Sequence, residues 1–475
     1  MARDRGGFSD SARPGAGSVT LVSLCLTTAL GIALGSYLAL CMHSARSSAR
    51  LLNQTEVQEL AQTGLEEALW ALNNNNWTGS GPGGNTSWTT SGANRAATLT
   101  YTLPGSNLAG QVALSVADYA STGPTWPTIT SAATVTLASG ETISKSLRAT
   151  TGPVPLFGNA IASASSYVSF AAGGTVDSWN SDPDNDSSTP AVAYSFTAGS
   201  PANYSAVVAG RTNGTYGVVL TQAAVRGYVA TFGLPVSYST SGSPPASVTG
   251  PTTPAGTNVD TARLGKSAFV PLAPVFTVTP PTVDSSGGGL LSSVLTLVAT
   301  LLGAPTGTVF EWNGDLNVNG GLPLPLLNSS PSLTINTPTQ FVVDGDLAIG
   351  STGQITIAPG GSLELFVKGD VTIGGNGIDN QTHEPKKLVI FCTGNSTSDT
   401  ITYTTSHDFC GAIYSENKPI DIRQNATFYG ALLSGQYVRF GTSATAPVFH
   451  YDAALRQVRF NGVATPYLLT QVTEL

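Results

Sequence analysis

The sequence predicts a mainly β protein with one long N-terminal α-helix, a small antiparallel β region and a C-terminal parallel β-helix, or solenoid. Three observations lead to this fold class. An uncharged apolar stretch runs from Ser18 to Met42, and an amphipathic helical pattern continues it to Leu72. Beyond residue 310, short β runs recur at steps of about 20 residues without any helical pattern, which is typical of stacked β turns.

Composition fits an exported β-rich protein better than a cytosolic enzyme. The 475 residues are enough for two or three domains, and only 10% of them are charged, against roughly 25% in ordinary soluble domains. Gly, Ser, Thr and Asn take the place of charged residues, which favours short strands and tight turns. The net charge of −8 is spread without a basic stripe, so we expect no nucleic-acid partner.

The stretch of residues 18–42, SVTLVSLCLTTALGIALGSYLALCM, is a candidate membrane span. It carries no charge and is longer than the ~20 apolar residues that a helix needs to cross a bilayer. Flanking charges leave its orientation open, because arginines lie on both sides (Arg3, Arg5, Arg13, Arg46 and Arg50). The alternatives are a buried core helix and a secretory signal peptide, whose apolar region is usually about 7–15 residues.

The pattern after the span favours a retained anchor over a cleaved signal peptide. Apolar residues recur at steps of three and four from Leu51 to Leu72, with polar residues between them, and Asn73 to Asn76 then end the pattern. We therefore expect a pilin-like helical segment over residues 18–75, in which one helix from Ser18 to Leu72 is about 80 Å long at 1.5 Å per residue. Its first half is apolar all round and its second half is amphipathic.

A basic leader over residues 1–17, a glycine, an uncharged helix and an amphipathic continuation together resemble the type IV pilin-like proteins. Gly17–Leu24 and Ala61–Ala68 are similar to the PilX-like minor pilins. The resemblance implies a leader cleaved between Gly17 and Ser18, a single pass through the inner membrane, and a C-terminal domain in the periplasm or on the cell surface. It also implies other pilin-like subunits and the assembly machinery as partners.

One departure from the family pattern bears on the expected role. Most pilins carry a glutamate five residues into the mature chain, and Val22 occupies that place here. We therefore expect a minor, tip or accessory component rather than the main filament subunit.

Residues 76–152 predict a small antiparallel sheet beside the helix. A Gly-, Ser- and Asn-rich linker over 77–90 is followed by alternating patterns at Thr98–Tyr101, Ala133–Leu137 and Thr142–Arg148. Gly152–Gly158 contains two prolines and marks a domain boundary.

The remaining chain predicts a solenoid with an insertion. We expect first solenoid turns over 153–233, a Pro- and Gly-rich insertion over 234–309, and the main solenoid over 310–475. Within the insertion, the apolar run Leu290–Leu302 is too short to span a bilayer easily, so we expect a short helix or strand covering the solenoid, or an interaction surface.

Two internal repeats support the solenoid over a multi-sheet sandwich, which is the alternative. A Gly-Asp-apolar-x-apolar motif begins at Gly314, Gly345 and Gly369, and a second series comprises Phe391–Gly394, Phe409–Ala412 and Phe428–Ala431. Alternate residues should then face inward (Leu347, Ile349, Ile355, Ile357, Leu363, Leu365, Val371 and Ile373). Val176–Asn180, Phe428–Leu432 and His450–Leu455 also resemble the β-solenoid found on PilX-like proteins.

Two candidate sites arise from residue spacing. Cys392 and Cys410 hold matching places in successive repeat units, and stacked strands about 4.8 Å apart would allow a disulfide in an oxidising compartment. Asp182, Asp184 and Asp186 alternate as calcium ligands do, although an acidic solvated turn is the simpler interpretation, because Ser187 and Ala193 replace the glycine and glutamate of an EF-hand loop. Calcium is thus a weak candidate, and we expect no other cofactor.

Nothing in the sequence points to catalysis. The four histidines form no HExxH or Cys/His cluster, and no GxSxG elbow or P-loop is present. A polysaccharide-cleaving β-helix enzyme would need clustered acids, and the charges of 310–475 are scattered. We therefore expect a non-enzymatic minor pilin-like protein that displays its solenoid outside the cytoplasm. The alternative is a membrane-anchored surface or periplasmic protein that binds a surface ligand and never enters a filament.

Overall fold

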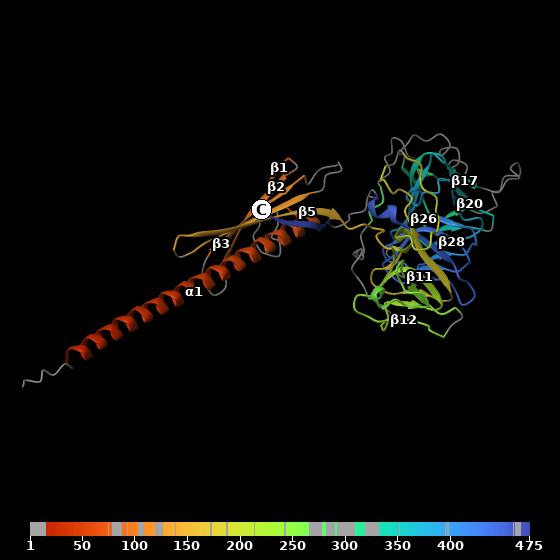
Figure 1. Ribbon diagram of the computed structural model, residues 1–475. Coiled ribbons are helices and arrows are strands. Elements are labelled where there is room, and N and C mark those ends of the chain that lie inside the picture. Colours follow the sequence, from red (N-terminus) through yellow and green to blue (C-terminus); the bar gives the residue numbers. More distant parts are fainter. Residues whose placement is uncertain are drawn as a thin grey trace, which may run out of the picture. The chain divides into compact units, whose positions relative to one another are not determined.

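The computed structural model describes residues 16–475 apart from gaps, the longest at 78–87, 103–108, 119–126, 266–277, 282–289, 292–308, 319–331 and 461–466. The chain divides into two compact units (Figure 1). The first comprises Met1–Gly152 with Tyr467–Leu475, and the second comprises Pro153–Pro466. The predicted fold class is confirmed: a long helix, a small antiparallel sheet and large parallel sheets follow one another.

The first unit is a long helix packed on an antiparallel sheet. Helix α1 runs from Ala16 to Asn73, and at 1.5 Å per residue its 58 residues extend about 87 Å. The sheet has the order β1 (Thr89–Ser91), β2 (Asn94–Thr102), β3 (Ala109–Ala117), β4 (Thr128–Thr136), β5 (Thr142–Pro153), β31 (Tyr467–Glu474). Strands β1 to β5 pair antiparallel with their sequence neighbours, as expected from the alternating pattern.

Only the second half of α1 packs on this sheet. Its buried residues follow the helical period, and they form one core with the inner face of β2 to β5 (Val57, Leu60, Ala61, Leu65, Ala68, Ala71 and Leu72). Gly64 lies at the closest approach, since a Cβ there would come within 2.3 Å of Ser131 Oγ and 2.6 Å of Val112 Cγ1. The amphipathic pattern therefore becomes a helix–sheet interface.

The second unit is a parallel solenoid, whose described strands form three sheets. The wide sheet has the order β14 (Leu290–Leu291), β15 (Val309–Trp312), β18 (Pro338–Val343), β21 (Ser362–Val367), β24 (Leu388–Cys392), β26 (Phe409–Ser415), β28 (Thr427–Ser434), β30 (Val448–Asp452), β8 (Gly174–Trp179), β11 (Ala223–Ala230), β9 (Ala206–Gly210), β6 (Ile161–Ser163), and β13 (Ser247–Thr249) also pairs with β11. The middle sheet has the order β12 (Val236–Tyr238), β10 (Val218–Leu220), β7 (Val168–Phe170), β29 (Val438–Phe440), β27 (Ile420–Ile422), β25 (Ile401–Tyr403), β22 (Val371–Ile373), β19 (Leu347–Ile349), β16 (Leu316–Val318). The short sheet has β17 (Ser332–Ile335), β20 (Gln354–Ile357) and β23 (Ile378–Asn380). Short 3₁₀ helices lie at Pro201–Tyr204, Thr261–Arg263, Pro385–Lys387 and Ala453–Gln457.

The Gly-Asp repeat forms one corner of the solenoid. Asp315 Oδ1 accepts a hydrogen bond of 2.9 Å from the backbone N–H of Asp346, and Asp346 Oδ1 accepts one of 2.8 Å from the N–H of Asp370. The preceding glycine must be small, because a Cβ on Gly345 would lie 2.3 Å from Asp315 Oδ1. The strands that follow pair in register, and all eight residues predicted to face inward are at most 2% exposed.

The turns of the solenoid do not stack in sequence order. The first half of β28 pairs with β30 and its second half pairs with β6, so that the last turn of the chain packs on the first. Strand β11 likewise pairs with β8 over its first half and with β9 over its second. Segments near residues 170 and 450 therefore become neighbours, which the sequence pattern does not reveal.

Two segments differ from the expected organisation. The final strand, β31, leaves the solenoid and joins the antiparallel sheet beside β5. In the insertion, β12, β13 and the short strand β14 belong to the solenoid sheets, and residues 292–302 of the predicted apolar segment lie outside the described residues.

Candidate functional site

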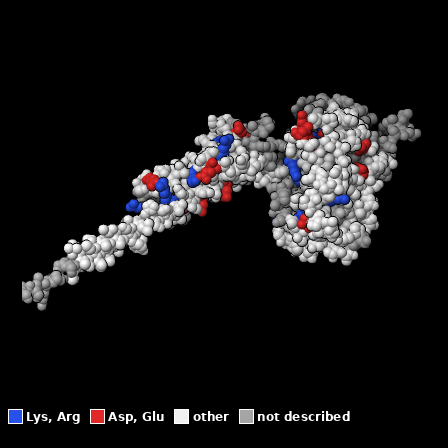
Figure 2. Space-filling view, viewed as in Figure 1, with Lys and Arg blue, Asp and Glu red and all other residues white. Residues whose placement is uncertain are grey.

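The first half of α1 presents an apolar surface without protein contacts. Its large hydrophobic side chains from Val19 to Met42 are between 50% (Leu38) and 71% (Ile32) exposed. Figure 2 shows this part of the helix without charged side chains. Among the described residues, α1 is the one helix long and apolar enough to cross a membrane.

The hydroxyl groups of Ser23, Thr27 and Thr28 bond within the helix. Thr27 Oγ1 donates to Ser23 O at 2.8 Å, and Thr28 Oγ1 donates to Leu24 O at 2.8 Å. Hydroxyls satisfied in this way are compatible with hydrocarbon, where an unpaired polar group is costly.

The predicted leader-cleavage site lies at the start of α1. Gly17 and Ser18 belong to the first turn of the helix, which begins at Ala16, whereas residues 1–15 lie outside the described residues. Val22 is 61% exposed on the helix surface, so the position at which most pilins carry a glutamate is exposed and apolar in this chain.

The candidate calcium loop uses its carboxylates for other contacts. Asp182 Oδ2 accepts a hydrogen bond of 2.9 Å from Lys386 Nζ, and Asp182 Oδ1 accepts one of 3.0 Å from the N–H of Asp186. These bonds lower the pKa of Asp182, with the Lys386 hydrogen bond as the largest cause. Asp184 Oδ1 accepts from Thr189 Oγ1 at 3.2 Å. Across the described part of the chain, no group of three acidic, cysteine or histidine side chains could hold a metal ion.

The structure does not bring Cys392 and Cys410 together, and both thiols are free. The register places Cys392 opposite Ser415, five residues beyond Cys410 on β26. At about 3.3 Å per residue this is roughly 16 Å along the strand, whereas a disulfide needs a Cα separation of about 4.4–6.8 Å. The expected disulfide is therefore absent because the matching motifs, Phe391–Gly394 and Phe409–Ala412, are not in register.

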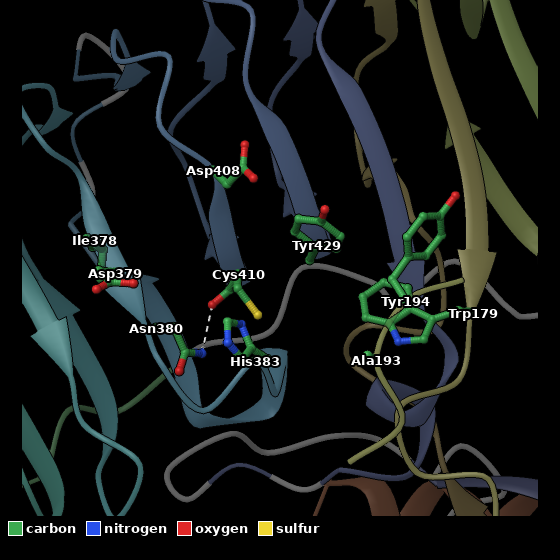
Figure 3. Close-up of a pocket in the computed structure, with 10 residues that line it drawn as sticks. All are labelled: Trp179, Ala193, Tyr194, Ile378, Asp379, Asn380, His383, Asp408, Cys410 and Tyr429. Atoms are coloured by element: carbon green, nitrogen blue, oxygen red, sulfur yellow. Dashed lines mark hydrogen bonds between the residues drawn. The ribbon is translucent and has the colours of Figure 1, made fainter. Parts of the chain in front are cut away.

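A pocket of about 490 Å³ lies on the outer face of the wide sheet (Figure 3). Its lining combines three aromatic rings, two carboxylates, an imidazole and a thiol (Trp179, Ala193, Tyr194, Ile378, Asp379, Asn380, His383, Asp408, Cys410 and Tyr429). In Figure 3, Cys410, Tyr429 and Asp408 lie between the 378–383 segment on one side and Trp179 with Tyr194 on the other.

The aromatic wall of this pocket is rigidly packed. The rings of Trp179, Tyr194 and Tyr429 meet edge to face, with centroids 5.7–5.9 Å apart. Trp179 Nε1 donates to Val192 O at 3.2 Å. The wall is thus assembled before any ligand arrives.

A buried charge network fixes Tyr194. Asp177 is 1% exposed at its side chain, and its Oδ2 accepts hydrogen bonds from Tyr194 Oη at 2.8 Å and Arg226 Nη1 at 3.1 Å. Its Oδ1 lies 2.5 Å from His450 Nδ1, and the Tyr194 and His450 rings stack with centroids 3.6 Å apart. Burial, followed by the hydrogen bond to Asp177, raises the pKa of Tyr194.

The polar side chains of the pocket differ in how far they are already occupied. Asn380 is committed to the fold, since its Nδ2 donates to Glu384 O at 3.0 Å and Cys410 O at 2.9 Å. Asp408 Oδ1 accepts from the N–H of Thr427 at 3.2 Å. Burial raises the pKa of Cys410 to about 12, which keeps the thiol protonated and unreactive.

Sequence reasoning missed this pocket. Cys410, Tyr429, His450 and Asp177 lie side by side on β26, β28, β30 and β8. Cys410 and Tyr429 each occupy the second position of a repeated motif, beginning at Phe409 and Phe428. This shared position in the sequence indicated that the two residues are neighbours. The step from His450 to Asp177 required knowing that the last turn packs on the first.

Comparisons with known proteins match a family model over only part of the chain. Residues 328–458 match a domain of unknown function (DUF7305). The sequence matches no curated protein. Among solved structures, the competence-associated pilin ComZ from Thermus thermophilus aligns over 82% of this chain and 86% of its own, at 11% identity and a TM-score of 0.23. A TM-score this low carries no argument about fold or function.

Proposed function

We propose that this chain is a pilin-like structural protein whose solenoid is displayed outside the cytoplasm. One observation carries the proposal: a single continuous helix has an exposed, uncharged apolar half and a half that packs on an antiparallel sheet. A helix of this kind needs an apolar environment for its first half, and either a bilayer or neighbouring apolar helices would provide it.

The proposed pathway has two stages. The first half of α1 spans the inner membrane once, with the leader on the cytoplasmic side, and cleavage between Gly17 and Ser18 then allows the helix to enter a filament. Val22 lacks the charge that most pilins carry at this place, so the proposal assigns a minor or accessory role. Other pilin-like subunits and the assembly machinery are the expected partners.

The solenoid suits the role of a displayed body. Its turns are joined by parallel strand pairing, and one hydrophobic core of buried described residues has members from Val154 to Phe460. Lys418, whose side chain is fully buried, donates from Nζ to Lys368 O at 2.6 Å and forms an ion pair of 3.2 Å with Asp399. Such internal bonding suits a rigid spacer or a rigid binding surface.

The proposal is tested by N-terminal sequencing of the full chain from two fractions, sheared filaments and membranes, of cells that assemble type IV pili. We expect a mature start at Ser18 in the filament fraction. Gly17→Val should leave Met1 intact and remove the protein from filaments, whereas the matched control Gly31→Val, inside the span, should still be cleaved. An intact Met1 found only in membranes would support the alternative, an anchored protein that is never assembled.

A further inference from the structure

We propose that the pocket on the outer face of the wide sheet binds an uncharged saccharide. The pocket is bounded by Trp179 and Tyr194 on one side, by Asp379 and His383 on the other, and by Asp408 and Tyr429 between them (Figure 3). This inference goes beyond the anchoring role and does not depend on whether the chain enters a filament.

Size and position favour a small-molecule site. A volume of about 490 Å³ falls within the ~300–1,000 Å³ of typical ligand pockets. All ten lining residues belong to the second unit and lie among the described residues. The pocket is therefore complete within the solenoid.

The aromatic wall provides a surface for the apolar face of a sugar ring. A pyranose presents C–H groups on its faces and hydroxyl groups around its rim, and C–H groups are buried favourably against aromatic rings. Tyr429 and Tyr194 are both half-buried, which leaves part of each ring accessible. Because the three rings pack edge to face against one another at 5.7–5.9 Å, they form a wall and leave no space between them to enclose an ammonium group.

The rest of the lining provides acceptors for the hydroxyl groups. Asp408 is exposed and accepts the Thr427 N–H with Oδ1, so Oδ2 accepts no hydrogen bond from the described residues. Asp379 uses Oδ2 for Gln381 Nε2 at 3.1 Å, which leaves Oδ1 available. The imidazole of the exposed His383 adds a group that can donate or accept. Hydroxyl groups that donate to carboxylates form strong, charge-assisted hydrogen bonds.

The charge of the lining selects among saccharides. Two carboxylates and no lysine or arginine line the pocket. Two cations elsewhere in the second unit are paired with other carboxylates, Arg226 with Asp177 and Lys386 with Asp182. An acidic sugar would therefore bring its carboxylate to an uncompensated negative site, which is unfavourable. The ligand class is a neutral hexose, pentose or N-acetyl sugar within an oligosaccharide.

Isothermal titration of the full chain tests the proposal. The protein is kept in a polyoxyethylene detergent, since a maltoside detergent would itself present sugar. The probes are cellohexaose, laminarihexaose, maltohexaose, xylohexaose and N-acetylchitohexaose, with tri-galacturonate as the acidic probe and choline as the cationic one. We expect at least one neutral probe to bind and neither charged probe to do so.

Pocket variants then locate the binding. Asp408→Asn keeps the acceptor for Thr427 and should weaken binding of the neutral probe about tenfold or more by removing a charged acceptor. Asp315→Asn is the matched control, since Asp315 is also exposed and also accepts one backbone N–H, at a distant corner of the solenoid; it should bind as the wild type does. Tyr429→Ala should weaken binding and Tyr429→Phe should largely preserve it, because the ring is the stacking surface.

Three results would overturn the proposal. The first is that no neutral probe binds with a Kd below about 10 mM. The second is that only tri-galacturonate or choline binds. The third is that a neutral probe binds equally well to wild type, Asp408→Asn and Tyr429→Ala, since binding would then lie elsewhere.

Discussion

Substitution of Gly64 tests whether the second half of α1 is held on the sheet by close contact. A Cβ at this position would lie 2.3 Å from Ser131 Oγ, 2.6 Å from Val112 Cγ1 and 2.8 Å from Leu114 Cδ2. Real Cβ atoms do not approach so closely, so these three side chains, the helix or the sheet must shift. Overpacking costs about 1–3 kcal/mol, and alanine regains up to about 1 kcal/mol of helix propensity.

We therefore expect Gly64→Ala to destabilise the first unit by about 1 kcal/mol and Gly64→Val by about 3 kcal/mol, since valine adds volume and a β-branch. Hydrogen exchange of the β3 and β4 amides is measured by mass spectrometry on the full chain. It should be roughly fivefold faster in Gly64→Ala and roughly a hundredfold faster in Gly64→Val than in the wild type. Gly31→Ala is the matched control, because nothing lies within 4 Å of a Cβ there, and exchange in β3 and β4 should not change.

A second substitution distinguishes steric contact from a general effect on the helix. Ser131 is fully buried, and its hydroxyl has no hydrogen-bond partner among the described residues. Ser131→Ala alone should stabilise the first unit by about 1 kcal/mol, and combined with Gly64→Ala it should restore part of the lost protection. If Gly64→Ala exchanged as slowly as wild type, the proposed helix–sheet contact would be incorrect.

Three further predictions concern the solenoid. Phe428 is 1% exposed and packs among other buried aromatic rings. Phe428→Ala should lower the free energy of unfolding by about 3–5 kcal/mol, and a urea titration that shows a loss below 1 kcal/mol would contradict this. Asp346→Ala should destabilise the second unit by about 1 kcal/mol by removing the hydrogen bond to the Asp370 N–H, whereas Asp346→Asn should cost less. Equal losses in urea would contradict a stabilising role for this hydrogen bond. Burial raises the pKa of Glu364, so the wild type loses stability as the pH rises from the unfolded-state pKa, near 4.5, through the raised folded-state pKa. Glu364→Gln retains the contact with Gln340 and should not lose stability over this pH range. If the urea midpoints of wild type and Glu364→Gln changed in the same way from pH 4 to 7, the raised pKa of Glu364 would be contradicted.

Local pattern was enough to predict the elements that depend on nearby residues. The amphipathic period predicted which face of α1 is buried, and the asparagines after Leu72 predicted where the helix ends. Both features depend only on a few successive turns of the helix. The Gly-Asp motif predicted a corner of the solenoid. It recurs because the aspartate carboxylate of one turn accepts a hydrogen bond from a backbone N–H of the next turn.

Long-range arrangement was not predictable in the same way. The matching Phe-Cys motifs suggested a disulfide, but Phe391 pairs with Tyr414 rather than Phe409, because the turns differ in length. Sequence order also could not show that β30 lies beside β8, or that β31 returns to the antiparallel sheet. The pocket depends on the first of these arrangements, so its residues could be assigned only from the structure.

The central claim, that the first half of α1 lies in hydrocarbon, is tested most directly by the natural thiol of Cys25. This residue is exposed on the helix surface and lies seven positions after Ser18, about 10 Å along the helix axis. Intact membranes that contain the full chain are treated with a charged maleimide, and labelling is assigned by peptide mass spectrometry. We predict that Cys25 is protected in membranes and becomes labelled once detergent and urea dissolve them; rapid labelling of Cys25 in intact membranes would contradict the account.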